Sequence, residues 1–137
     1  EFIYDRPFLW GSKRTGPDLH RQGGKYPDSW HYNHMLDPES LSPGSIMPPY
    51  PWLLTDDLDT RYTKAKIKVL QQLGTPYPED YADYLLDDLQ AQAEKIARSL
   101  EQDGIEQEGL ANKEIVALIA YPQRLGTDIK PVPQAEF

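Results

Sequence analysis

Residues 78–104 read PEDYADYLLDDLQAQAEKIARSLEQDG, and this stretch decides the fold class. Apolar residues recur in it at spacings of four and seven, as on one face of an α-helix: Tyr81, Leu85, Leu89, Ile96 and Leu100. Pro78 suits the start of a helix, and the acids Glu79 and Asp80 are favoured in a first turn by the helix dipole. Gly104 is a typical helix terminator. The stretch therefore predicts one long amphipathic helix.

A second helix is predicted upstream of this stretch. Thr55 or Asp56 can cap its N-terminus, and Gly74 can end it. Between these points apolar residues recur at spacings of three and four, which again indicates one face of a helix: Leu58, Tyr62, Ala65, Val69 and Leu73.

A third helix is predicted downstream, from a cap at Asn112 to Gly126, with a stripe of Ile115, Leu118, Ile119 and Leu125. Pro122 lies inside it and predicts a kink, because proline lacks an amide donor and crowds the preceding turn. No pair of strands and no internal repeat is visible in the sequence. The predicted fold class is all-α.

The first 55 residues differ in character, being rich in Pro, Gly and aromatic residues. They contain one predicted short helix over residues 29–36, with Asp28 as its N-cap and the Asp37-Pro38 pair as its end. Regular helix is excluded through residues 41–52 by four prolines: Pro43, Pro48, Pro49 and Pro51. A loop this rigid normally wraps a ligand or lines a site.

Composition excludes several classes of function. The 137 residues carry a net charge of -8, with no basic stripe of the kind that binds nucleic acid. No run approaches the roughly 18 consecutive apolar residues of a membrane span. Cysteine is absent, which excludes thiolate metal sites, iron–sulfur clusters, a cysteine nucleophile and the C-x-x-C-H motif of covalent haem attachment.

Three segments, in this order, resemble class I cytochromes c: RTGPDLH at 14–20, SIMP at 45–48 and LIAYPQRL at 118–125. The resemblance implies that the Pro17 carbonyl accepts a hydrogen bond from the proximal histidine. It implies that Met47 is the sixth ligand of the haem iron, and that Tyr121 packs on the N-terminal helix of the domain. The alternative to this ligand role is that Met47 only fills a gap in the packing of the loop. Met35, on the short helix, is assigned to the core.

A narrower resemblance covers nearly the whole chain. FLWGSKRTGPDL at 8–19, GGKY at 23–26, the Trp30-His31 pair, His34 and MPPYPWL at 47–53 are similar to the monohaem cytochrome c subunit of cbb3-type cytochrome c oxidases, also called CcoO or FixO. In that family a membrane anchor and the C-x-x-C-H motif lie upstream. Because the chain starts at Glu1 and has no cysteine, we expect it to be the part downstream of the haem motif.

The resemblance implies a class I cytochrome c-like domain without its N-terminal helix and haem-attachment motif. Residues 1–55 would form the loops of the haem crevice, residues 56–104 a helical insertion, and residues 112–126 the C-terminal helix. Haem c belongs to the intact protein and is not expected on this cysteine-free chain. The residues implied at the cofactor are Met47, Pro17, Arg14, Gly16, Leu19, Trp30, Trp52 and Tyr121.

The physical chemistry of such a site agrees with these residues. A thioether is a soft ligand that favours reduced iron, so a His/Met pair raises the reduction potential. Prolines on both sides of Met47 would hold the ligand loop still when the iron changes oxidation state. Trp30, Tyr50 and Trp52 would exclude water and set the local dielectric constant. Arg14 with Lys13 has two equally weighted interpretations, neutralisation of haem propionates or a solvated basic pair.

Other chemistry-bearing residues have simpler interpretations. His31 and His34 are three residues apart and could share a metal, but no further ligand has a matching spacing, so a position at the haem edge or the surface is preferred. His20 is assigned to the surface. Asp87 and Asp88 are interpreted as a solvated helix face. The Gly23-Gly24 pair lacks the strand–turn–helix setting of a phosphate-binding loop.

The sequence thus predicts an electron-transfer subunit of a respiratory terminal oxidase. By resemblance its partners are the haem–copper catalytic subunit and the dihaem cytochrome c subunit, at the periplasmic face of the bacterial inner membrane. The chain would meet the membrane only through an upstream anchor, and it could self-associate through surface left open by the missing helix. The alternatives are a non-redox assembly module built on residues 56–104 and a small metal-dependent or hydrolytic enzyme using His31 and His34.

Overall fold

The computed structural model describes residue 16 and residues 18–127. Within these residues the backbone forms helices joined by loops, with one isolated antiparallel bridge between Asp57 and Lys113. The elements are α1 (Asp28–Leu36), α2 (Pro38–Leu41), α3 (Trp52–Thr55), α4 (Thr63–Gln72), α5 (Tyr81–Gln102), a 3₁₀ turn (Leu110–Asn112) and α6 (Glu114–Arg124). The all-α prediction is confirmed. No helix of the described ranges is long and apolar enough to cross a bilayer.

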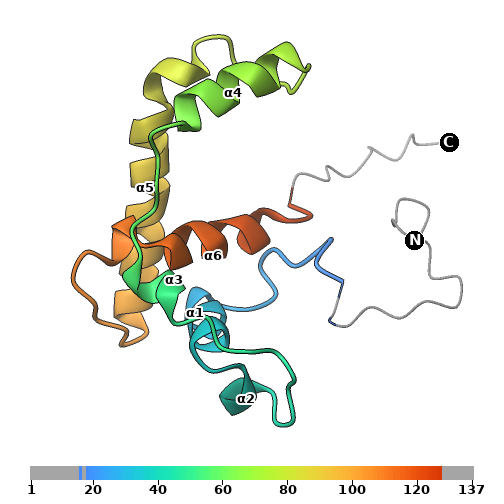
Figure 1. The fold of residues 1–137 in the computed structure, drawn as a ribbon, viewed down its shortest axis with the longest axis vertical. Coiled ribbons are helices and arrows are strands. Elements are labelled where there is room, and N and C mark those ends of the chain that lie inside the picture. The colour runs from blue at the N-terminus through green and yellow to red at the C-terminus, as the bar shows by residue number, and fades with distance from the viewer. Residues whose placement is uncertain (1–15, 17, 128–137) are drawn as a thin grey trace, which may run out of the picture.

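The long helix α5 is the spine of the molecule (Figure 1). α6 and the 3₁₀ turn pack against its C-terminal half, while α1 contacts both α5 and α6, and α3 contacts α6. The core is purely aliphatic at its centre, where Leu100, Ile115, Val116 and Ile119 are almost completely buried. Leu54 and Leu110 complete it, together with Tyr32 of α1. The core thus joins the N-terminal part of the chain to its last helix.

The prediction for α5 is confirmed, with its first residue at Tyr81 rather than near Pro78. The predicted stripe faces inward: Leu85 and Leu100 are buried, and Tyr81, Leu89 and Ile96 are half-buried. The hydrophobic core includes three residues of this helix: Ala93, Ala97 and Leu100. Residues 56–104 are therefore not a separable appendage, because their second half builds the centre of the fold.

The start predicted for the preceding helix is wrong. α4 begins at Thr63, and the chain before it runs beside the segment that leads into α6. Leu58 N–H donates to the Asn112 carbonyl at 2.8 Å, and Glu114 N–H donates to the Asp56 carbonyl at 3.0 Å. These long-range bonds satisfy backbone groups that a helix would otherwise have paired locally.

The apolar stripe predicted for this helix does not face the core. Tyr62, Val69 and Leu73 are 64%, 52% and 77% exposed. The helix instead turns Thr63 and Ile67 towards α5, where they line a cavity of about 260 Å³. A stripe with three- and four-residue spacing normally marks the buried face, so the outward position of this one is a feature that needs an explanation.

The N-caps predicted for α1 and α6 are both wrong. α6 begins at Glu114 with Lys113 as its N-cap, and Asn112 belongs to the 3₁₀ turn. Asp28 is the first residue of α1 rather than its N-cap, which is Pro27, and its side chain makes no capping bond. Its carboxylate accepts a hydrogen bond from Gln123 Nε2 of α6 at 2.8 Å instead. Pro122 lies within α6 close to its C-terminal end; the kink stays a prediction. As expected, no helix forms between Leu41 and Trp52, although short helices that were not predicted end and begin at these residues.

Candidate functional site

The loop that carries Met47 is fixed at several points. Met47 is half-buried, and its N–H donates to Ser45 Oγ at 3.2 Å. Tyr50 N–H donates to the Met35 carbonyl at 2.8 Å, which ties the loop to the end of α1. At the other end, Ser42 N–H donates to the Pro38 carbonyl at 3.0 Å. Three prolines follow Met47 within four residues, and they restrict the backbone of the loop that carries the thioether.

Aromatic side chains of α1 and of Tyr26, which precedes it, pack together; we call Tyr26, Trp30, His31 and His34 the α1 aromatic cluster. Trp30 stacks between Tyr26 at 4.1 Å and His34 at 4.5 Å between ring centroids. His31 lies edge-on to Trp30 at 5.3 Å. Because these aromatic rings pack on one another, the cluster holds the side chains of Trp30, His31 and His34 in fixed orientations along α1.

The two histidines of this cluster are buried more deeply than the sequence suggested. His31 is 5% exposed, and within the described part of the chain neither its Nε2 atom nor His34 Nδ1 has a hydrogen-bond partner. Burial lowers the pKa of both imidazoles, and the neighbouring His34 lowers that of His31 further while Asp28 opposes the shift. Both side chains are therefore neutral near pH 7. Within the described residues they have no third side chain with which to hold a metal.

This burial predicts that the protein loses stability as the pH falls. The unfolded chain takes up a proton on His31 below its ordinary pKa of about 6.5, whereas the folded chain does so only at a lower pH. The free energy of unfolding should be constant above about pH 7 and should decrease below about pH 6.5 by up to about 1.4 kcal/mol for each pH unit. Urea titrations at several pH values measure it.

The matched control for this prediction is His20, which is exposed. A His31→Gln variant should show a weaker pH dependence between about pH 7 and pH 5, while a His20→Gln variant should behave like the wild-type chain. Identical pH profiles of the wild-type chain and His31→Gln would show that His31 does not carry the effect.

Three large apolar side chains implied at the cofactor remain uncovered. Leu19 is 51% exposed, Trp52 51% and Tyr121 62%. Trp52 lies edge-on to Tyr50 at 5.3 Å between centroids, and Gly16 is exposed, with no atom of the described residues near the position of a Cβ. Arg14 and Pro17 lie outside the described residues. The structure thus brings Trp30 into the α1 aromatic cluster and Trp52 beside Tyr50, and it leaves Leu19 and Tyr121 open to solvent.

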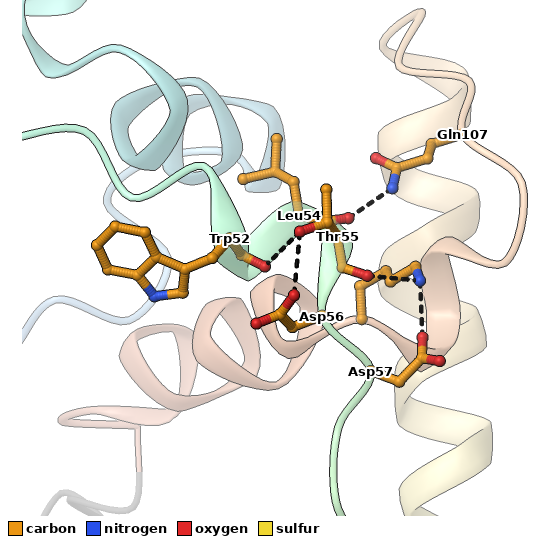
Figure 2. A network of polar contacts seen from close by, with 7 residues as sticks. Trp52, Leu54, Thr55, Asp56, Asp57 and Gln107 are labelled. Atoms are coloured by element: carbon orange, nitrogen blue, oxygen red, sulfur yellow. Dashed lines mark hydrogen bonds and ion pairs between the residues drawn. The ribbon is translucent and has the colours of Figure 1, made fainter.

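A polar network anchors the segment that carries Trp52 (Figure 2). Gln107 Nε2 donates to the Leu54 carbonyl at 2.6 Å, and its Oε1 atom accepts from Tyr32 Oη at 3.0 Å. Lys113 Nζ donates to the Thr55 carbonyl at 2.8 Å and pairs with Asp57 at 2.7 Å. The indole of Trp52 points away from these contacts in Figure 2. Gln107 was not singled out from the sequence, where a glutamine in a loop gives no signal of its contacts.

The loop around Gly23 docks on the end of α6. Gly23 N–H donates to the Leu125 carbonyl at 2.9 Å, and Gly24 N–H donates to Gln123 Oε1 at 3.0 Å. Gln123 Nε2 also donates to the Tyr26 carbonyl at 2.9 Å. The glycine pair thus allows a close approach between this loop and the end of α6.

Substituting Gly23 is expected to break this contact. A Cβ atom there would lie 2.6 Å from the Gln123 carbonyl oxygen and 2.7 Å from that of Leu125, both backbone atoms. We expect Gly23→Ala to lower the free energy of unfolding by about 1–3 kcal/mol. Gly16→Ala is the control, because a methyl group there would meet no atom of the described residues within 4 Å. Equal denaturation midpoints for the two variants would contradict the docked loop.

The family described as "Cytochrome C oxidase, mono-heme subunit/FixO" matches residues 1–129 of the chain. The match covers the sequence RTGPDLH at 14–20, the Met47 loop and α6 together. The chain belongs to the FixO family. No curated protein matches it. The sequence resemblance to the monohaem subunit of cbb3-type oxidases is thereby confirmed, and with it the assignment to electron transport by a cytochrome c oxidase.

FixO proteins are haem c subunits, and they are anchored in the membrane. The 137 residues contain no cysteine, so the thioether attachment of the haem is absent from this chain. In their chemistry, the described residues that the resemblance implies at the cofactor fit such a group. Met47 offers a soft thioether ligand on a loop that prolines make rigid. Leu19, Trp52 and Tyr121 expose large apolar side chains that a flat macrocycle could cover.

Proposed function

We propose that this FixO chain contributes the methionine ligand and one wall of the haem pocket in the electron-transfer subunit of a cbb3-type oxidase. The observation that carries the proposal is Met47, a half-buried thioether on a loop that hydrogen bonds fix to α1 and α2. When bound, haem c supplies one-electron exchange. The chain itself performs no bond chemistry; it positions the ligand, limits movement of the ligand loop and keeps water away.

Each implied residue has a role that follows from its chemistry. Met47 favours reduced iron and raises the potential at which the subunit accepts an electron. Trp30, Trp52, Leu19 and Tyr121 supply apolar surface that lowers the local dielectric constant, and Gly16 lets the backbone approach closely. For Arg14 we propose a bidentate contact with a propionate, and for the Pro17 carbonyl a hydrogen bond from the proximal histidine.

The proposed partners are the haem–copper catalytic subunit, which takes the electron, and the dihaem subunit, which delivers it, at the periplasmic face of the inner membrane. The family membership supports this placement. Deleting residues 56–104 does not separate electron transfer from an assembly role, because Leu100 and its neighbours in α5 build the core. Single-turnover spectroscopy of the assembled oxidase does separate them. After the reduced complex meets oxygen, the haem c of this subunit should be oxidised within one turnover, whereas a haem c that stays reduced during turnover would refute the proposal.

The 137-residue chain on its own is expected to purify without haem, because it has no cysteine to hold the group covalently. Its absorption spectrum should lack a Soret band even after expression with the haem-maturation machinery. A stoichiometric haem that survives denaturation would contradict this expectation, whereas the complete subunit expressed in the same cells serves as the positive control.

A further inference from the structure

The outward face of α4 is an apolar stripe with no partner in the described part of the chain. Tyr62, Ala65, Val69 and Leu73 follow one another at spacings of three and four, with Tyr62 and Leu73 as the N-cap and C-cap of α4, so they lie along one side of the helix. All four are exposed. The opposite side of α4 carries Thr63 and Ile67, which line the cavity against α5. We call the exposed side the α4 stripe.

Basic residues accompany this stripe in an otherwise acidic chain. The chain has 14 basic and 22 acidic residues, yet residues 60–78 contain no acid and four basic side chains: Arg61, Lys64, Lys66 and Lys68. Lys64 stands on the edge nearer α5, where it pairs with Asp83 at 2.9 Å. Lys66 and Lys68 are exposed and, at 100° per residue, flank the stripe on its two sides. Arg61 pairs with Asp59 at 2.7 Å, so Lys66 and Lys68 are the two lysines of α4 for which the described residues show no salt bridge.

This combination matches the chemistry of a membrane surface. Helices that lie in the headgroup region present an apolar stripe to the acyl chains, with lysines on both sides that reach back to the phosphates. Tyrosine is favoured at the same depth because its ring is apolar and its hydroxyl group is polar. α4 lies at one end of the molecule, far from α1 and α2 (Figure 1), so a flat surface can reach it without covering the Met47 loop.

We propose that the α4 stripe lies on an anionic lipid bilayer and orients the domain on the membrane that anchors it. A helix of 10 residues buries little apolar surface, so its own affinity is low. Tethering compensates, because a membrane-anchored subunit holds the helix at a high effective concentration near the lipid. A protein partner would need a groove with acids on both rims to match a convex stripe flanked by lysines, whereas a bilayer offers that match everywhere.

Vesicle flotation with the 137-residue chain tests the proposal. The chain should float with vesicles of phosphatidylglycerol and phosphatidylcholine and not with phosphatidylcholine alone. Flotation should decrease between about 0.1 M and 1 M salt, as the screening length falls from about 10 Å to about 3 Å. Lys66→Gln with Lys68→Gln should lower the partition coefficient by about tenfold or more, and Val69→Ser with Leu73→Ser should also lower it.

Matched controls lie elsewhere on the surface. Lys95→Gln with Arg98→Gln removes two exposed basic residues of α5, and Ile46→Ser removes an apolar side chain that is 86% exposed on the Met47 loop. Both should keep the wild-type partition. Since the substituted α4 positions are exposed, far-UV circular dichroism should show unchanged helix content.

Three results would overturn the proposal: no flotation with anionic vesicles, equal flotation with neutral vesicles, or α4 variants that float like the wild-type chain. Release of the subunit from the oxidase complex by the α4 substitutions, without any vesicle binding, would assign the stripe to a protein partner and also overturn it. None of these results concerns the single-turnover oxidation of haem c, so the electron-transfer proposal stands or falls separately.

Discussion

Replacing Met47 with leucine in the complete subunit is expected to lower the reduction potential of its haem c. Leucine has nearly the volume of methionine, so packing should change little, but it has no sulfur to ligate iron. The thioether favours the reduced state, and axial ligands move haem potentials over a range of about 0.8 V. We therefore expect the reduction potential to fall by a sizeable fraction of that range. Optical redox titration of the assembled oxidase measures the potential, and loss of the sulfur-to-iron charge-transfer band reports the missing ligand.

The chain provides a matched control for this substitution, since it contains two methionines. Met35 packs against the core and its carbonyl holds the Met47 loop through a backbone bond that the substitution does not alter. Met35→Leu should therefore keep both the potential and the charge-transfer band. A Met47→Leu variant with an unchanged band and potential would remove this residue as the ligand, whatever the family assignment.

Truncating Leu100 is expected to have the largest effect on stability. Its side chain is 0% exposed, and it packs with the core residues of α1, α3 and α6. Leu100→Ala removes buried methyl groups and leaves a cavity, which costs about 2–5 kcal/mol. Because the free energy of unfolding of such domains is only about 5–15 kcal/mol, this substitution should remove a large part of it. Urea denaturation followed by circular dichroism gives the difference in the free energy of unfolding.

Leu86 on the same helix is the control, because its side chain is 51% exposed. Leu86→Ala should change the free energy of unfolding by no more than about 0.5 kcal/mol. Equal losses for the two variants would mean that α5 does not present the Leu85–Leu100 face to the core. Such a result would also remove the reason for treating residues 56–104 as part of the main fold.

Much of the candidate site could be predicted because its signals are local. Each of the three segments that carry the resemblance occupies a few consecutive residues: 14–20, 45–48 with Met47, and 118–125. Their order along the chain supported the assignment to the family. The burial of His31 could not be predicted, because the sequence of α1 does not show which side of the helix meets α5 and α6. Gln107 and Gln123 were missed for the same reason. Their partners are 53 to 99 residues away in the sequence.

By itself, the sequence determined the all-α class, the position of α5 and the absence of a covalent haem anchor, because periodicity and residue identity depend only on neighbours along the chain. Tertiary structure alone decided which way each face turned. The stripe from Tyr62 to Leu73 has the spacing of a buried face, yet it points outward. The strand-like contact of Asp56 and Leu58 with residues 112–114 uses the backbone before α4, and α4 then contacts α5 through Thr63 and Ile67. A periodic pattern specifies that a helix has an apolar side, whereas only the other elements decide what that side meets.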